Sequence, residues 1–341
     1  MRQDLQTIKR LLMVIVVALV IFLFKTLDFI FVPLVGALFL ALLFMPLMRW
    51  LYRHRVGKYV SATIVILLVA TLIKLGWELV RLSGQEIVEQ KAEVLDRIEA
   101  KLDTYLYLAK HFLGVDDGYL HQYIEGGKLM ENVLQFSGTA LKFLKDTISM
   151  GLITVFFLVL LLIDTVNVPK IMQTTLFHNQ YSSVKTFMQI ERSIVKFIEV
   201  KFLMSLFTGV GFTLACYLFG VSFPLFWGLL AFTLNYIQLI GAVVATTALA
   251  LFALAEIAQP GSWAAFVGIA VGIQLLFGSV IEPILMGKSF SINTITILIM
   301  LMFWGYIWGI PGMVLSIPIT VLLKIVFARF KQTQLISDLM S

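Results

Sequence analysis

The sequence predicts an all-α polytopic integral membrane protein, on the basis of its composition and the length of its apolar runs. Of its 341 residues, 60% are apolar and 13% are charged. A soluble globular protein has about 45–50% apolar and about 25% charged residues. No soluble core could bury this much apolar surface. The composition therefore excludes an ordinary cytosolic enzyme, a disordered chain and a disulfide scaffold.

About eight transmembrane helices are expected, because the apolar runs approach the roughly 20 residues that cross about 30 Å of hydrocarbon as a helix. The runs cover residues 11–27, 29–48, 59–80, 148–163, 202–219, 263–280, 292–310 and 313–327. The apolar stretch 223–256 is too long for one ordinary span and rather short for two. We therefore expect a broken helix pair there, which either crosses the membrane or re-enters it from one side.

Residues 81–145 differ from the spans, since charged and apolar residues interleave at helical spacing. This pattern predicts an amphipathic helical insert, in which Ser83 and Glu86 form a candidate capping box at the start of a helix. The insert is too short for a catalytic core, so we interpret it as a helical hairpin packed on the membrane domain or on a neighbouring subunit. Three parts result: N-terminal transmembrane helices (1–80), the insert (81–145) and a C-terminal transmembrane domain with broken helices (146–341).

The lysines and arginines of the short loops predict the orientation. They gather at the N-terminus, in the loop 49–58, in the connector 164–201 and at the C-terminus. All four segments lie on one side if both termini are cytoplasmic, which makes the insert extracytoplasmic. Within the connector, residues 184–198 carry an apolar stripe typical of an interfacial helix. The residues expected on the remaining surface of that helix are Lys185, Arg192, Lys196 and Lys201.

The sequence contains no motif of soluble-enzyme chemistry. It lacks a glycine-rich phosphate loop with its lysine, an HExxH zinc motif and a nucleophile elbow. Cys216 stands alone in an apolar run, and the four histidines lack the spacing of metal ligands. We therefore expect neither a cofactor nor a metal. Because the basic residues cluster in loops between spans, the net charge of +6 indicates membrane orientation and not binding to nucleic acid. The expected partners are the lipid bilayer and a small solute.

The first candidate site is the segment 234–241, where Asn235, Gln238 and Gly241 interrupt an apolar stretch. In hydrocarbon, a broken helix survives only against protein or a water-filled cavity. Transporters place substrate sites at such breaks, because the freed backbone groups can bind a solute. We therefore expect Asn235, Gln238 and Gly241 to line a substrate pathway. The alternative is that Asn235 and Gln238, three residues apart on one helix face, only hydrogen-bond between helices.

The second candidate site is the segment 279–288. Pro283 is expected to end the preceding helix near Glu282, and Gly287 permits a turn. A carboxylate between two apolar spans is costly unless it reaches water, a partner or a substrate. Glu282, Pro283 and Gly287 are therefore also assigned to the substrate pathway. The alternative is a structural ion pair between Glu282 and Lys288 at the water boundary.

A third segment, 303–312, is interpreted as structural, forming a tight turn between the last two spans. Its glycines permit close contact between helices, and its tryptophans suit the membrane interface. The residues assigned to this turn are Trp304, Gly305, Gly309 and Gly312.

These three segments, in this order, resemble the autoinducer-2 exporter family of bacterial membrane permeases, and the resemblance covers nearly the whole chain. They read Leu-Asn-Tyr-Ile-Gln-Leu-Ile-Gly at 234–241, Glu-Pro-Ile-Leu-Met-Gly at 282–287 and Phe-Trp-Gly-Tyr-Ile-Trp-Gly-Ile-Pro-Gly at 303–312. One position departs from the family, which usually has proline where this chain has Gln238. The helix break is therefore expected either to be lost there or to shift to Gly241.

The resemblance implies a passive or ion-coupled permease of the bacterial inner membrane, without enzymatic activity, that exports autoinducer-2 or a similar small polar solute. It also implies that the protein assembles into a homo-oligomer of five subunits, a pentamer. Two alternatives stay open. A sodium/proton antiporter is suggested by other family members and by Glu282 as a titratable carboxylate, although no acidic residue lies near a span centre. A membrane scaffold, whose insert binds a partner protein, would have no transport activity.

Overall fold

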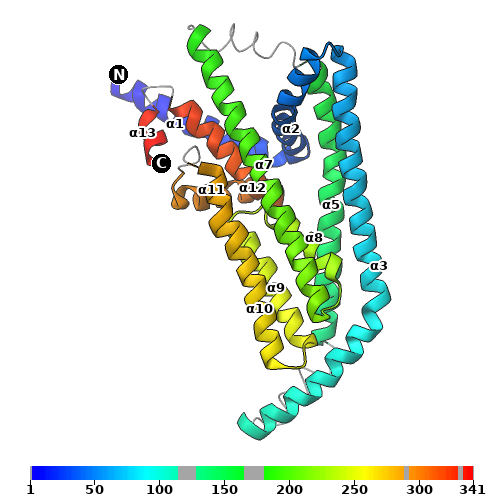
Figure 1. The fold of residues 1–341 in the computed structure, drawn as a ribbon. Coiled ribbons are helices and arrows are strands. Elements are labelled where there is room, and N and C mark those ends of the chain that lie inside the picture. Colours follow the sequence, from blue (N-terminus) through cyan, green and yellow to red (C-terminus); the bar gives the residue numbers. More distant parts are fainter. Residues whose placement is uncertain (1, 114–127, 165–179, 288–291, 329–332, 341) are drawn as a thin grey trace. The chain divides into compact units, whose positions relative to one another are not determined.

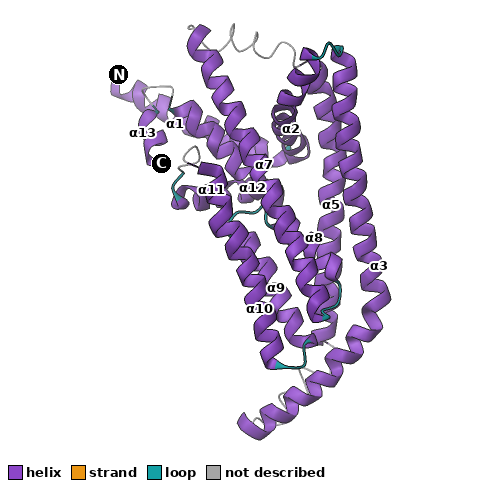
Figure 2. Ribbon diagram, in the orientation of Figure 1, coloured by secondary structure: helices purple, strands orange, loops and turns teal. Residues whose placement is uncertain are grey.

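The computed structural model describes residues 2–113, 128–164, 180–287, 292–328 and 333–340 (Figure 1). Every regular element within these ranges is a helix, and none is a strand (Figure 2). Six of the described helices are long and apolar enough to cross a membrane, and three shorter helices are also apolar. The short ones are Leu11–Thr26, Pro224–Leu234 and Ile240–Glu256. The expectation of an all-α polytopic membrane protein is confirmed.

The chain forms two compact units, each assembled from segments that are distant in the sequence. Unit 1 comprises Met1–Leu68, Gly151–Ile198 and Lys288–Ser341, and unit 2 comprises Val69–Met150 and Glu199–Gly287. Three long helices contribute residues to both units: α3 (Lys58–Leu113), α5 (Lys128–Asp164) and α7 (Gln180–Phe219). The predicted boundaries at residues 80 and 145 fall inside α3 and α5, and the division 1–80, 81–145 and 146–341 stays a prediction about membrane topology.

Unit 1 contains α1 (Arg2–Thr26), α2 (Asp28–Arg53), α12 (Thr294–Phe327) and α13 (Gln334–Leu339). The indole Nε1 of Trp308 on α12 donates a hydrogen bond to the carbonyl oxygen of Phe24 on α1, at 2.9 Å. The two spans expected at 292–310 and 313–327 are joined in α12, whose backbone kinks at Gly309 with φ 61° and ψ −142°. This positive φ is readily available only to glycine. The kink thus lies within the segment interpreted as a turn.

Unit 2 adds a series of shorter helices that follow one another along the chain. They are α8 (Pro224–Leu234), α9 (Ile240–Glu256), α10 (Pro260–Gln274), the π-helix η2 (Leu275–Ile281) and α11 (Glu282–Met286). The expectation that residues 223–256 form two short helices is confirmed by α8 and α9. The core of the unit includes fully buried apolar side chains from four helices. These are Phe212, Phe226, Leu249 and Phe266, from α7, α8, α9 and α10.

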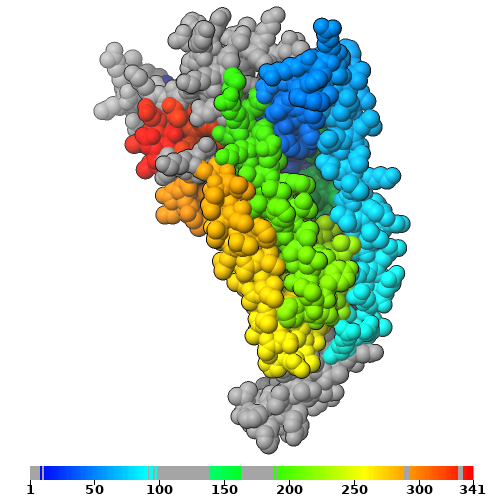
Figure 3. Space-filling view, viewed as in Figure 1, coloured from blue at the N-terminus to red at the C-terminus, as the bar shows by residue number. Residues whose placement is uncertain are grey.

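The helices of unit 2 pack closely around α7. A Cβ placed on Gly228 of α8 would lie 2.7 Å from the carbonyl oxygen of Gly209 on α7, so the two backbones meet where neither residue has a side chain. On another side of α7, a Cβ on Gly211 would lie 3.0 Å from the side chain of Ile273 on α10. Figure 3 shows the surfaces of α7 and α10 meeting side by side. Small residues at these contacts are typical of helices that associate within membranes.

Several sequence-based expectations about helix ends are wrong. Helix α3 continues through the proposed capping box, with Ser83 buried inside it, and α5 likewise joins the second half of the insert to the following span. Helix α7 fuses the expected interfacial helix to the fifth span. In each case polar and apolar segments adjoin without a proline or a left-handed residue to interrupt the backbone. A change in polarity alone does not end a helix.

Glu86 of the wrong capping box serves another helix, together with Gln90. Glu86 of α3 accepts a hydrogen bond from the backbone N–H of Phe226 at 3.4 Å, and Gln90 accepts one from the N–H of Phe223 at 3.2 Å. Phe223 precedes α8 in the left-handed conformation, with φ 60°. The first N–H groups of a helix have no partner within it, so α3 caps α8 from outside. This capping allows a short helix to begin among buried apolar side chains.

Candidate functional site

The backbone between α8 and α9 leaves helical geometry at residues 235–239. Leu239 has φ 64° and ψ −58°, and the N–H of Ile240 donates to the carbonyl oxygen of Gln238 at 2.7 Å. Together these values describe a γ-turn with positive φ, which is rare and strained. Gly241 follows in the first turn of α9, where an added Cβ would lie 1.8 Å from the carbonyl oxygen of Leu234. The break therefore occurs beside Gln238 even without the family's proline.

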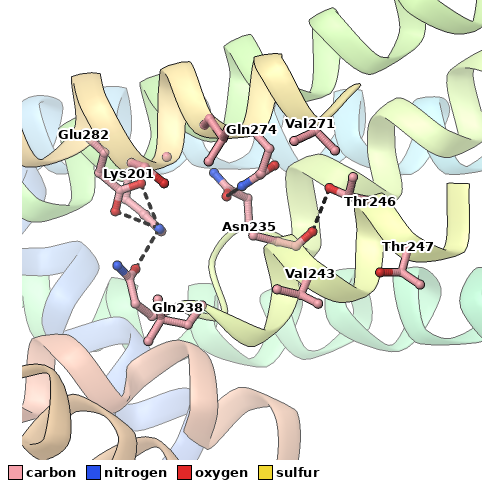
Figure 4. Close-up of a pocket in the computed structure, with 14 residues that line it drawn as sticks. Lys201, Asn235, Gln238, Val243, Thr246, Thr247, Val271, Gln274 and Glu282 are labelled. Atoms are coloured by element: carbon pink, nitrogen blue, oxygen red, sulfur yellow. Dashed lines mark hydrogen bonds and ion pairs between the residues drawn. The ribbon is translucent and has the colours of Figure 1, made fainter. Parts of the chain in front are cut away.

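A cavity of about 350 Å³ lies beside this break, inside unit 2 (Figure 4). Cavities that hold small molecules in proteins have volumes of about 300–1,000 Å³. The surrounding helices are apolar, but eight of the lining residues are polar. They are Lys201, Asn235, Gln238, Thr246, Thr247, Gln274, Ser279 and Glu282. The cavity is thus large enough for a small solute and rich in hydrogen-bonding groups.

The charged part of the lining is an ion pair between Lys201 of α7 and Glu282 of α11. The ammonium Nζ of Lys201 lies 2.8 Å from Oε1 and 3.1 Å from Oε2 of Glu282. It also donates to Oε1 of Gln238, at 2.9 Å. Both charged side chains are only 3% exposed. Since an ammonium group has three N–H donors, these contacts occupy all of them, and each charge is compensated within the protein.

The amide part of the lining connects three elements. Asn235 donates from Nδ2 to the hydroxyl of Ser205 on α7, at 3.1 Å. Its Oδ1 accepts from Nε2 of Gln274, at the end of α10, at 3.3 Å. Asn235 is only 4% exposed. Its amide nitrogen and its amide oxygen both have hydrogen-bond partners, which a buried amide requires. The expected hydrogen bonds between helices exist, but Asn235 and Gln238 follow α8 and do not share a helix face.

The π-helix η2 lies between two polar residues of the cavity lining. Gln274 is the last residue of α10 before η2, and Glu282 is the first residue of α11 after it. A π-helix closes i to i+5 hydrogen bonds and is common at functional sites. The helical path then continues through Pro283 to Met286, so the expectation that Pro283 ends the helix near Glu282 is wrong. A proline near the start of α11 needs no N–H, and the path ends instead at Gly287, whose φ is 65°.

The structure brings only some of the predicted site residues to the cavity. Asn235, Gln238 and Glu282 line it. Gly241 lies in the first turn of α9, and Pro283 and Gly287 lie beyond Glu282, so these three are not among the lining residues. The segment assigned to a turn, with Trp304, Gly305, Gly309 and Gly312, belongs to unit 1. Lys288, offered as the alternative partner of Glu282, lies outside the described residues.

The residue that the sequence analysis missed is Lys201. It was expected on the polar surface of an interfacial helix, but it is buried and paired with Glu282. Because α7 is one continuous helix, Lys201 is carried into the apolar bundle. A signal was present in the sequence: Lys201 directly adjoins the apolar run 202–219, and Glu282 has few charged neighbours in its own segment. These two unmatched charges could have been paired.

A polytopic helical membrane protein with a polar cavity beside a broken helix pair has the features of a membrane transport protein. The comparison with known families agrees. The chain belongs to the AI-2E family of transporters, whose profile, described as "AI-2E family transporter", matches residues 11–332. The resemblance that the three sequence segments indicated is thereby confirmed.

Relatives with similar sequences carry transport names. The chain is 30% identical to "AI-2 transport protein TqsA" of Escherichia coli, over 92% of this chain and 89% of that protein. It is 26% identical to "Putative transport protein" of Borreliella burgdorferi, over 92% of this chain and 85% of that protein. It is also 26% identical to "Putative transport protein YhhT" of Escherichia coli, over 87% and 83%. The chain is therefore a multi-pass membrane permease of a bacterial transporter family.

Proposed function

We propose that this permease moves a small polar solute through the cavity of unit 2, and that the solute is autoinducer-2 or a similar molecule. The observation that carries the proposal is a cavity of about 350 Å³, lined by amides, hydroxyls and a compensated ion pair, in an otherwise apolar bundle. Polar groups inside a membrane are costly and mark the pathways of solutes and ions. The solute itself is proposed from the resemblance and from the name of one relative.

Several hydrogen-bonding atoms of the lining are available to a solute. Nε2 of Gln238 and Oε1 of Gln274 belong to side chains whose other amide atoms bond to Lys201 and Asn235. The hydroxyls of Thr247 and Ser279 lie on lining residues that are themselves exposed. Donors and acceptors are therefore both present at fixed positions. Such a site suits a molecule with several hydroxyl or carbonyl groups and little apolar surface.

Transport in this proposal is secondary, since the sequence contains no phosphate-binding loop that would couple it to ATP. We further propose that both termini are cytoplasmic, as the short-loop charges predict. The permease works in the inner membrane in this proposal, and it assembles into a homo-oligomer of five subunits, a pentamer. The relatives give no support to the sodium/proton antiporter or to the scaffold, so neither alternative is proposed.

Flux through the purified protein in liposomes tests the proposal. Asn235→Leu and Gln238→Leu each remove hydrogen-bonding groups from the lining while keeping the side-chain size similar. A lost hydrogen bond is worth about 0.5–1.5 kcal/mol, so each variant should reduce solute flux by roughly 2- to 13-fold. The matched control is Gln135→Leu, an exposed amide of α5 outside the lining, which should transport normally. Normal flux in both lining variants would place the pathway elsewhere.

A further inference from the structure

The ion pair between Lys201 and Glu282 has a property that the other polar residues of the cavity do not share. It places two full charges in the wall of the cavity, and these two charges cancel each other. Both side chains line the cavity, both are 3% exposed, and their charged atoms are 2.8 Å apart. Figure 4 shows the ammonium group between the carboxylate of Glu282 and the amide of Gln238.

Each charge of the pair is held by partners that a solute would have to displace. Glu282 offers both carboxylate oxygens to Lys201, and Gln238 accepts the remaining donor of the ammonium group. Among the lining residues that the structure describes, an anion entering the cavity finds no free positive group, and a cation finds no free carboxylate. A charge taken out of water without a partner is strongly disfavoured in a low-dielectric site. An uncharged solute meets no such penalty at the amides and hydroxyls.

Gln238 is held in place by the backbone as well as by Lys201. The backbone carbonyl oxygen of Gln238 accepts a hydrogen bond from the N–H of Ile240 in the strained γ-turn at Leu239. A residue kept in a rarely populated conformation persists only when its surroundings fix it, and such residues are frequent at functional sites. The Gln238 amide thus acts as a fixed third partner that directs the ammonium group toward Glu282.

We propose that the Lys201–Glu282 pair is the charge-selectivity element of this permease, and that it restricts transport to uncharged solutes. Lys201 and Glu282 are equally needed, because removing one exposes the other to the cavity as an uncompensated charge. Glu282→Gln leaves the ammonium group and should admit anions. Lys201→Gln leaves the carboxylate and should admit cations. The proposal rests on the proposed function, since it concerns the same cavity.

The experiment measures three solutes of nearly equal size in liposomes that contain the purified full-length protein. They are ribose, which is neutral, ribonate, which is an anion, and 1-amino-1-deoxyribitol, which is a cation at neutral pH. The natural protein should favour ribose over both charged solutes. Relative to ribose, Glu282→Gln should increase ribonate flux at least about tenfold, and Lys201→Gln should increase the flux of the amine similarly. A tenfold change corresponds to only about 1.4 kcal/mol, which is small beside the electrostatics of a desolvated charge.

Two combined variants guard against misfolding of the single ones. The reversed pair, Lys201→Glu with Glu282→Lys, and the neutral pair, Lys201→Gln with Glu282→Gln, both have no net charge. Both should again favour ribose over the charged solutes, whatever their absolute rates. The matched control is Glu191→Gln, which breaks an ion pair of unit 1 between Arg49 and the buried Glu191. It should leave the order of preference unchanged.

The outcomes separate this inference from the proposed function. If the natural protein transports ribose but neither single variant gains a charged solute, the selectivity role is refuted and the permease function stands. If the natural protein moves none of the three solutes but the single variants gain ions of the expected sign, the selectivity role stands and this solute class is refuted. Equal losses for all three solutes in every variant would show a purely structural pair and overturn the inference.

Discussion

The stability of the Lys201–Glu282 pair gives a prediction whose size can be worked out from the structure. Both side chains are 3% exposed, and the ammonium group makes three contacts of 2.8–3.1 Å. Breaking a buried ion pair by removing one partner costs about 3–5 kcal/mol, because an uncompensated charge stays buried. Lys201→Met should therefore destabilise the protein by about that amount. Replacing both partners with hydrophobic residues of similar volume often costs little, so Lys201→Met with Glu282→Met should recover most of the loss.

The assay is thermal unfolding of the purified protein in detergent, followed by intrinsic fluorescence. A change of 1 kcal/mol shifts the unfolding temperature by about 2–4 °C in domains of this order of size. We expect a fall on the order of 10 °C for Lys201→Met and a clearly smaller fall for the double variant. An exposed pair serves as the control: Arg81 and Glu78 of α3 are 57% and 47% exposed, so Arg81→Met should shift the temperature by no more than about 4 °C.

Two results would refute the reasoning. If Lys201→Met unfolds at the temperature of the natural protein, water reaches Glu282 and the pair is not buried in the folded protein. If the double variant is as unstable as the sum of the two single variants, the side chains act independently and the pair has no coupling energy. Either result would also remove the electrostatic basis for charge selectivity.

Three further predictions concern the backbone and the topology. Gly241→Ala should lower both the unfolding temperature and the solute flux, because the new Cβ would lie 1.8 Å from the carbonyl oxygen of Leu234 on α8. The control Gly261→Ala places its Cβ in open space and should change neither quantity. Leu239→Gly should unfold at a higher temperature than Leu239→Ala, because only glycine tolerates φ 64° without strain; the reverse order would show that the γ-turn is unstrained. In a cysteine-free background, a membrane-impermeant thiol reagent applied to intact cells should label Ala92→Cys but not Arg53→Cys; the opposite labelling would invert the proposed orientation.

Three of the residues that line the cavity could be predicted from the sequence. Asn235, Gln238 and Glu282 are polar residues within long apolar runs, and hydrocarbon tolerates such residues only where they have partners or a cavity. Their positions in the sequence were therefore enough to select them. The same reasoning failed for Lys201, because it stands at the edge of an apolar run, where a charge normally reaches the interface. Only the continuity of α7 carries it inside.

The end points of helices were less predictable than their existence. Ser83 and Glu86 match a capping pattern, yet α3 passes through them, because tertiary contacts gave Glu86 a different helix to cap. Pro283 matches a helix end, yet the π-helix before it and its position near the start of α11 let the helical path continue. In both cases a local pattern had two physical solutions, and packing selected between them.

The sequence by itself determined that this protein is an all-α membrane protein with a break between two short helices, because apolar length and polar interruptions act locally along the chain. The tertiary structure decided which polar groups meet. Lys201 and Glu282 are 81 residues apart, and no spacing rule links them. Their pairing follows from the packing of α7 against the helices of unit 2, which leaves two buried charges with each other and the amide of Gln238 as their partners among the described residues.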